Sequence, residues 1–129
     1  MTGDVIPTES ELAILAVLWK RGPSTVRDVH DALGREDGKG AGYTTTLKQL
    51  QVMATKGLVS RDESSRSHVY AARVAESRTK RQVVRELLER VFGGSSAELA
   101  VHALSLKPAS KDELQALREL LDTQDKERK

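Results

Sequence analysis

The sequence predicts a mostly α-helical protein with a small β-hairpin wing. We expect a winged helix-turn-helix N-domain over residues 1–75 and a helical C-terminal dimerisation domain over residues 76–129. Three observations predict this fold class. Three helical segments come first, two short β-capable runs joined by a polar turn follow them, and amphipathic helical segments fill the second half. The first two observations define the winged arrangement, and the third defines a separate helical domain.

Length and composition exclude several other classes of protein. The 129 residues suffice for one ordinary domain or two small ones, and 31% charged residues with 38% hydrophobic residues are typical of a globular protein. The chain has no cysteine, which excludes disulfides and Cys-based metal sites. No apolar run reaches the roughly 20 residues of a membrane span, and residues 1–6 lack the pattern of a secretory signal. We expect a cytoplasmic protein with no cofactor, metal or membrane partner.

The first helix is predicted over residues 9–20. Thr8 and Glu11 have the spacing of a capping box, and Gly22-Pro23 ends the segment. Its apolar stripe consists of Leu12, Leu15, Leu18 and Trp19. Trp19 is the only tryptophan, and we interpret it as a core anchor rather than a binding aromatic.

The second helix is predicted over residues 25–33. Ser24-Thr-Val is a short β-capable or capping segment before it, Val26, Val29 and Leu33 form its stripe, and Gly34 ends it. His30 lies beside this stripe and is expected to be structural or exposed rather than a ligand. Residues 35–42 are expected to form a flexible loop, whose glycine and lysine spacing does not match a phosphate-binding P-loop.

The third helix, over residues 43–57, is the candidate for reading DNA. Leu47, Leu50 and Ala54 share one face, Thr44 or Thr45 can cap the start, and Gly57 fits a left-handed C-terminal cap. The opposite face has hydroxyls, amides and two lysines but no acid, a composition that suits the major groove. The alternative is an ordinary surface helix.

Residues 58–63 and 68–73 are the two strands of the predicted hairpin, with the turn at residues 64–67. Arg61, Arg66 and His68 give it positive or protonatable groups. Residues 39–73 carry a net charge of +4, whereas residues 1–38 carry −3, so the basic charge is concentrated where a nucleic acid would bind. The predicted contacts with double-stranded DNA are Tyr43, Thr44, Thr45, Thr46, Lys48, Gln49, Val52, Arg61, Arg66 and His68.

The second half predicts a helical arm that pairs with a second copy of the chain. A long amphipathic helix over residues 76–92 ends at Gly93-Gly94, two further helices follow capping boxes that begin at Ser95 and Ser110, and a polar tail from about residue 122 is expected to fray. An isolated arm leaves large apolar side chains uncovered, each worth roughly 1.5–3 kcal/mol on burial. Folding back onto the winged domain is the alternative to a homodimer. The predicted dimerisation residues are Val83, Val84, Leu87, Leu88, Val91, Phe92, Leu99, Leu114, Leu117, Leu120 and Leu121.

The order and spacing of several motifs resemble the penicillinase-repressor (BlaI/MecI/CopY) family of bacterial transcriptional regulators. The motifs are Glu11-Leu12 through Leu18-Trp19, Gly22-Pro23 through His30, Tyr43-Thr-Thr-Thr-Leu47, Lys56-Gly-Leu-Val59, Arg66 with Tyr70, and Phe92-Gly-Gly94. The resemblance implies a winged-helix domain, a helical dimerisation domain and repression by a homodimer on a pseudo-palindromic operator dyad. It also implies that Thr44, Thr45 and Lys48 contact DNA.

Two departures from the family concern the inducing signal. Copper-responsive members carry C-terminal Cys-x-Cys motifs, and this chain has no cysteine. In β-lactam-responsive members a sensor protease pathway cuts an Asn-Phe bond, where this chain has His102-Ala103. The sequence therefore does not decide whether a sensor protease is a partner, and a protease that cuts this chain would need a specificity other than for an Asn-Phe bond.

Other functions have little support in the sequence. The three histidines lie in three separate elements, and no metal-binding H-E-x-x-H motif, nucleophile elbow or dinucleotide fingerprint is present. We therefore predict no catalytic residues and no enzyme. The remaining alternative is a winged-helix module that binds an acidic protein without specific DNA binding.

Overall fold

The computed structural model describes residues 6–37 and 42–128. These residues belong to two compact units, Met1–Val83 and Val84–Lys129, and the division falls inside the fourth helix. We expected the boundary before that helix, at residue 75. Thr79, in the part of the helix that belongs to the first unit, is only 2% exposed.

Helix α1 (Glu9–Arg21) is fixed at both ends by its local sequence. The Thr8 hydroxyl accepts the backbone N–H of Glu11 (3.2 Å), and the Glu11 carboxylate accepts the N–H of Thr8 (2.9 Å), which confirms the predicted capping box. Gly22 ends the helix with a φ of 86°, a conformation that favours glycine. The helix buries Ile14, Leu15 and Leu18.

A two-residue strand, β1 (Ser24–Thr25), leads directly into α2 (Val26–Asp37). The Asp28 N–H donates to the Thr25 hydroxyl (3.1 Å), and the Thr25 N–H donates to the Asp28 carboxylate (3.2 Å). The helix continues past Gly34, where we predicted its end. An interior glycine costs only about 1 kcal/mol relative to alanine, which is too little to stop a helix. Residues 35–37 of the predicted loop are therefore helical, and residues 38–41 lie outside the described part.

Helix α3 (Tyr43–Lys56) ends as predicted at Gly57, which is left-handed (φ 86°, ψ 12°). The Leu58 N–H then donates to the Met53 carbonyl (2.9 Å), as expected after such a cap. The helix begins at residue 43 as predicted, but the predicted capping by Thr44 or Thr45 was wrong, because Gly42 is the N-cap and no side chain caps the helix. Thr44 and Thr45 are exposed instead.

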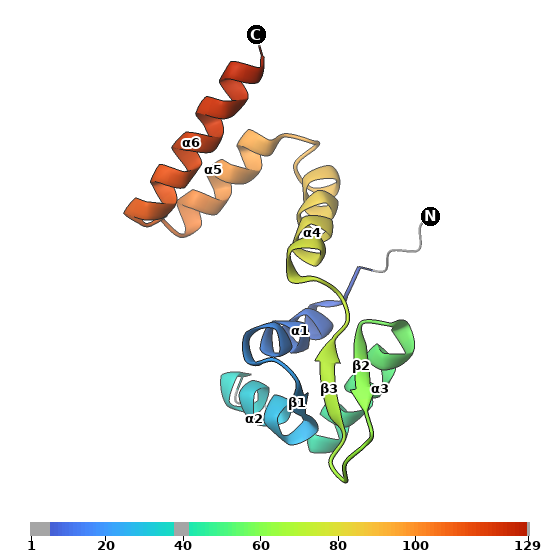
Figure 1. The fold of residues 1–129 in the computed structure, drawn as a ribbon. Coiled ribbons are helices and arrows are strands. Elements are labelled where there is room, and N and C mark those ends of the chain that lie inside the picture. Colours follow the sequence, from blue (N-terminus) through green and yellow to red (C-terminus); the bar gives the residue numbers. More distant parts are fainter. Residues whose placement is uncertain (1–5, 38–41, 129) are drawn as a thin grey trace. The chain divides into compact units, whose positions relative to one another are not determined.

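The sheet contains the predicted hairpin and one strand more. Strands β2 (Val59–Asp62) and β3 (Val69–Ala72) pair antiparallel, and β1 pairs with the other edge of β3 to give the order β1-β3-β2. The register places Thr25 and Asp62 on either side of Val69. The turn between β2 and β3 extends beyond the paired strands as the wing (Figure 1). The predicted winged-helix fold is confirmed.

One hydrophobic core holds the first unit together. Trp19 packs against it as predicted, and its indole N–H donates to the Val74 carbonyl (3.0 Å), which joins α1 to the chain after β3. The buried apolar residues are Ile14, Leu15, Leu18, Val26, Val29, Leu50, Met53, Leu58, Val59 and Tyr70. They come from α1, α2, α3, the residue after the Gly57 cap, and strands β2 and β3, so these elements together hold α3 in place.

The second unit comprises the end of α4 (Glu76–Arg90), α5 (Ser96–Leu106) and α6 (Lys111–Glu127). The Ser95 and Ser110 hydroxyls accept the N–H groups of Glu98 and Glu113 (both 3.1 Å), as their spacing predicted. Only the Ser110–Glu113 pair forms the full reciprocal box. Helix α6 continues to Glu127, so the polar tail that we expected to fray from residue 122 is largely helical.

Candidate nucleic-acid interface

The exposed face of α3 contains five of the ten side chains that the sequence predicted for DNA contact. Thr44, Thr45 and Lys48 are exposed, Val52 is 43% exposed, and Gln49 is half-buried at the edge. The helix contains no acid. Among the described residues no acid pairs with Lys48, so its ammonium group is free to bind an anion. This face can donate hydrogen bonds to bases or phosphates and offers one apolar side chain to a thymine methyl.

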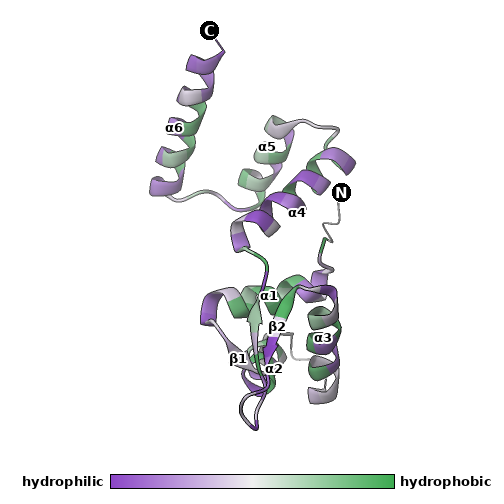
Figure 2. Ribbon diagram, turned by 45° about the vertical axis from the view of Figure 1, so that its right-hand side comes forward, coloured by the Kyte–Doolittle hydropathy of each residue, from purple (hydrophilic) through white to green (hydrophobic). Residues whose placement is uncertain are grey.

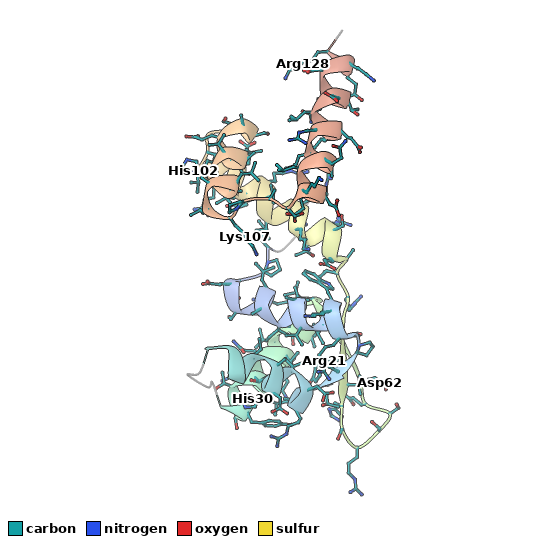
Figure 3. All side chains as sticks on the ribbon, turned by 90° about the vertical axis from the view of Figure 1, so that its left-hand side faces the viewer. Arg21, His30, Asp62, His102, Lys107 and Arg128 are labelled. Carbon is teal, nitrogen blue, oxygen red and sulfur yellow. The ribbon has the colours of Figure 1, made fainter. Side chains whose placement is uncertain are left out.

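Thr46 is the exception, and its predicted DNA contact is wrong. Its side chain is only 2% exposed, and its hydroxyl lies 3.0 Å from Nδ1 of His30 on α2. The buried face of α3 is therefore centred on Thr46, Leu50 and Met53, with Leu47 and Ala54 half-buried beside it. The structural role expected for His30 is confirmed, because it joins α2 to α3; it is labelled in Figure 3.

Tyr43, the first residue of α3, lies between two side chains of α2. Its ring is 42% exposed and meets the His30 ring edge-on, with centroids 5.8 Å apart at 72°. The Arg27 guanidinium carbon lies 5.0 Å from the Tyr43 ring centroid, in cation–π contact. The start of α3 is thus held by α2 through aromatic and cation–π contacts, and Arg27 is a residue that the sequence did not indicate.

The wing presents its three basic residues differently. Arg61, on β2, forms an ion pair with Glu63. Arg66 and His68, in and after the turn, are exposed and have no acid partner among the described residues. They line a recess of about 250 Å³ together with Arg27 and Tyr43. The free positive groups of the wing therefore face the starts of α2 and α3.

The far end of α3 is tied to α1 by an ion pair. Lys56 Nζ lies 2.7 Å from Oε2 of Glu11, whose side chain is only 8% exposed. Burial has the largest effect and raises the pKa of the Glu11 carboxyl, but bonds from Lys56 and Thr8 together outweigh it and leave the pKa below its ordinary value of 4.5. Lys56, which the helical pattern placed on the DNA-facing side, is therefore used for folding.

We expect Glu11→Gln to destabilise the first unit by about 1–3 kcal/mol at pH 7, because it leaves Lys56 without its partner. Since the folded pKa is depressed, this stability is present above pH 4.5 and is lost as pH falls through the folded value. Urea unfolding followed by Trp19 fluorescence at pH 7 and pH 4 measures it. The wild type should lose more stability on acidification than Glu11→Gln, and an equal loss would contradict the assignment.

The predicted dimerisation residues lie on α4, α5 and α6 and in the turn after α4, and none is fully buried. Val83, Leu88, Phe92 and Leu99 are half-buried. The exposed ones are Val84, Leu87, Val91, Leu114, Leu117, Leu120 and Leu121, between 36% and 65%. Figure 2 shows hydrophobic stretches along α5 and α6 among hydrophilic ones. Across residues 84–128 no side chain is fully buried, so within one chain the arm has no closed core.

A groove of about 540 Å³ runs between α5 and α6. Its apolar lining includes Leu104, Leu117 and Leu120, and Lys107 and Glu113 also line it. Three exposed apolar residues of α5 that were not among the predicted dimerisation residues, Val101, Leu104 and Leu106, extend the uncovered surface. They were missed because the apolar stripe of α5 is short and the prediction kept only Leu99.

No catalytic or metal-binding constellation is evident in the part of the chain that the structure describes. Its residues contain no group of three or more His, Asp or Glu side chains that could hold a metal ion. His102 lies on α5 with its ring 5.5 Å from that of Phe92, and His30 lies on α2 (Figure 3). In the same described residues, no helix is both long and apolar enough to cross a membrane.

Three helices, a three-stranded sheet and an acid-free exposed face on the third helix define a winged-helix protein of the kind found among transcriptional regulators. Comparison with protein families agrees. Residues 7–123 match the family model described as penicillinase repressor, so the chain belongs to the penicillinase repressor family. The resemblance drawn from the motifs is thereby confirmed.

Individual relatives support the same class. The chain is 42% identical over 62 residues to the proteins named transcriptional regulator BlaI in two strains of Mycobacterium tuberculosis, CDC 1551 / Oshkosh and H37Rv. The match covers 47% of this chain and 44% of each relative, which is less than half of their length. Together with the family, it supports a transcriptional regulator.

Solved structures support the fold. A complex structure of hsRosR-S4 superposes with a TM-score of 0.53 at 19% identity and covers 95% of this chain and 93% of that one. A MarR family protein from Bacillus stearothermophilus gives 0.50 at 19% identity, over 95% of this chain and 76% of that one. At this identity the likeness concerns the fold alone.

Proposed function

We propose that the protein is a sequence-specific, DNA-binding transcriptional repressor that acts as a homodimer on a pseudo-palindromic operator. The observation that carries the proposal is the exposed face of α3, where Thr44, Thr45 and Lys48 stand free of acids at the surface of a winged-helix unit. In such units the third helix enters the major groove and the wing follows the backbone. Membership in the penicillinase repressor family supports the same function.

The homodimer rests on the second unit. Its residues 84–128 include no fully buried side chain, although its helices carry many leucines and valines. Exposed apolar patches of this kind mark interaction surfaces in soluble proteins. A second copy of the arm would cover them and would bring two recognition helices to a site with twofold symmetry. Folding of the arm onto its own winged unit stays the alternative.

We expect selection from a random duplex library to enrich an inverted repeat whose half-sites lie about one helical turn, or a multiple of it, apart. Light scattering of the free protein at micromolar concentration should give about twice the 14.2 kDa of one chain. A monomer that binds DNA one chain at a time would overturn the dimer. A library without an enriched sequence would overturn specific recognition.

The second candidate function is a winged-helix module that binds an acidic protein. The salt dependence of binding distinguishes the DNA-binding function from the protein-binding one. For duplex DNA the logarithm of the binding constant should fall linearly with the logarithm of salt concentration, with a slope of about 0.9 per neutralised phosphate. Binding to the selected duplex should also survive an excess of unrelated DNA, which a merely basic surface would not allow.

The sensor protease pathway implied by the family stays a prediction. The His102–Ala103 bond lies inside α5, whereas proteolytic cuts favour exposed loop tips. Cutting there would first require local opening of α5. Hydrogen exchange of the α5 amides would show whether such opening occurs.

A further inference from the structure

The residues that line the recess between the wing and the starts of α2 and α3 come from three separate parts of the chain. They are Thr25, Val26, Arg27, Tyr43, Leu47, Arg66, Ser67 and His68. The antiparallel register brings them together: Thr25 of β1 lies opposite Val69 of β3, so the first turn of α2 lies next to the residues that precede β3. The recess is therefore part of the fold and does not depend on the position of a single side chain.

Charge in the first unit separates into paired and unpaired groups. Arg21, Lys56 and Arg61 each have an acid partner, Asp28, Glu11 and Glu63 respectively. Arg27, Arg66 and His68, like Lys48 on α3, have no acid partner among the described residues, and these three line the recess. Two guanidinium groups and an imidazole around one opening raise the local positive potential, which favours the binding of an anion. The recess therefore has the charge of an anion-binding site.

Arg27 is held in a way that leaves its donors free. The reciprocal Thr25–Asp28 bonds fix the first turn of α2, and the guanidinium lies against the Tyr43 ring at 5.0 Å. A cation–π contact uses no hydrogen-bond acceptor, so the N–H groups of the guanidinium remain available as donors. Such a preorganised planar donor matches two oxygens of a phosphate.

We propose that this recess binds one backbone phosphate of the duplex in each half-site. Arg27 donates hydrogen bonds to this phosphate from α2, and Arg66 and His68 contact it from the wing. The inference rests on the proposed DNA-binding function and deepens it. Because Arg27 also contacts Tyr43, the same phosphate fixes the start of α3 against the DNA. Arg27 is thus both a phosphate ligand and a positioning residue for the recognition helix.

The test compares full-length wild type, Arg27→Ala, Arg27→Lys and the control Arg73→Ala on the selected duplex and on a scrambled duplex at several salt concentrations. Arg73 follows β3 at the base of the hairpin, where Ala72 pairs with Val59, away from the turn that carries Arg66. Arg27→Ala should weaken binding to both duplexes about tenfold or more and should reduce the salt slope by about one per protomer. Arg27→Lys should have the salt slope of the wild type but a lower affinity, because lysine keeps the positive charge and lacks the planar pair of guanidinium N–H donors. Arg73→Ala should bind like wild type.

Replacing individual phosphates by neutral methylphosphonates locates the contact. One position in each half-site should weaken the wild type and leave the already weakened Arg27→Ala variant unchanged. If Arg27→Ala is folded by Trp19 fluorescence and binds DNA with the affinity and salt slope of the wild type, the proposed phosphate site is overturned while DNA binding by the protein stands. Absence of duplex binding by the wild type would overturn the proposed function itself. A third outcome would assign the recess to free phosphate instead. In that case, millimolar inorganic phosphate raises the melting temperature of the wild type but not of Arg27→Ala, and the salt slope of DNA binding is the same for both proteins.

Discussion

Leu117→Asp is expected to convert the protein from a dimer into a monomer and to weaken operator binding. Leu117 is 37% exposed and lines the groove between α5 and α6 beside Leu104 and Leu120. A carboxylate placed in an apolar interface without a partner costs several kcal/mol, which corresponds to roughly a hundredfold or greater loss in dimer affinity. Sedimentation velocity across a concentration series measures the dissociation constant directly. Leu87→Asp, on α4, should act in the same direction.

A matched control separates the interface from the added charge. Gln115→Asp adds the same carboxylate to α6 two residues earlier, which is about 200° around the helix from Leu117. It should remain dimeric. Trp19 fluorescence should report a folded winged unit in both variants, because Trp19 belongs to the first unit. A dimeric Leu117→Asp protein would show that the interface lies elsewhere on the arm.

The elements of the winged unit were predictable because their signals are local. The Thr8–Glu11 box, Gly22 and Gly57 each lie within a few residues of the end that they determine, and all three are observed there. The end of α2 was misplaced for the same reason. Gly34 is a local stop signal, but residues 35–37 remain helical beyond it. A weak local preference is easily outweighed by the residues on either side.

The composition of the site was less predictable because it depends on partners far away in the chain. Thr46 is one of three consecutive threonines and has nothing in its own sequence that distinguishes it from Thr44 or Thr45. Its burial follows from a bond to His30, 16 residues earlier. Periodicity placed the buried face on Leu47, Leu50 and Ala54, because apolar side chains were the only visible marker, and of these Leu50 is fully buried. The structure rotates that face toward Thr46 and Met53.

Arg27 escaped prediction because it belongs to a helix that is not expected to read DNA. The signal that could have found it is the short β-capable run Ser24–Thr25. Pairing of that run with β3 sets the start of α2 beside the wing. Strand pairing is a long-range property, and a two-residue strand has too little pattern to reveal its partner. The sequence therefore indicated each basic residue of the wing but not the third group that completes the recess.

Lys48→Ala is expected to cost about 1–3 kcal/mol on the specific site and to relax the preference at one position of each half-site. Lys48 lies one turn into α3, exposed and without an acid partner in the described part of the chain, where a side chain can reach base edges. Arg66→Ala, on the wing, should instead weaken specific and scrambled duplexes alike and reduce the salt slope by about one. The comparison uses the same two duplexes for both variants.

The alternative for Lys48 is a phosphate contact, because an ammonium group is a flexible point charge that binds either target. The two cases differ in specificity rather than in affinity. A base contact made by Lys48 contributes only on the correct sequence, so Lys48→Ala should narrow the ratio between specific and scrambled binding. A phosphate contact contributes on both duplexes, so the ratio would stay unchanged and the salt slope would fall. Equal losses on both duplexes would therefore refute base reading at Lys48 and move recognition to Thr44, Thr45 and Gln49.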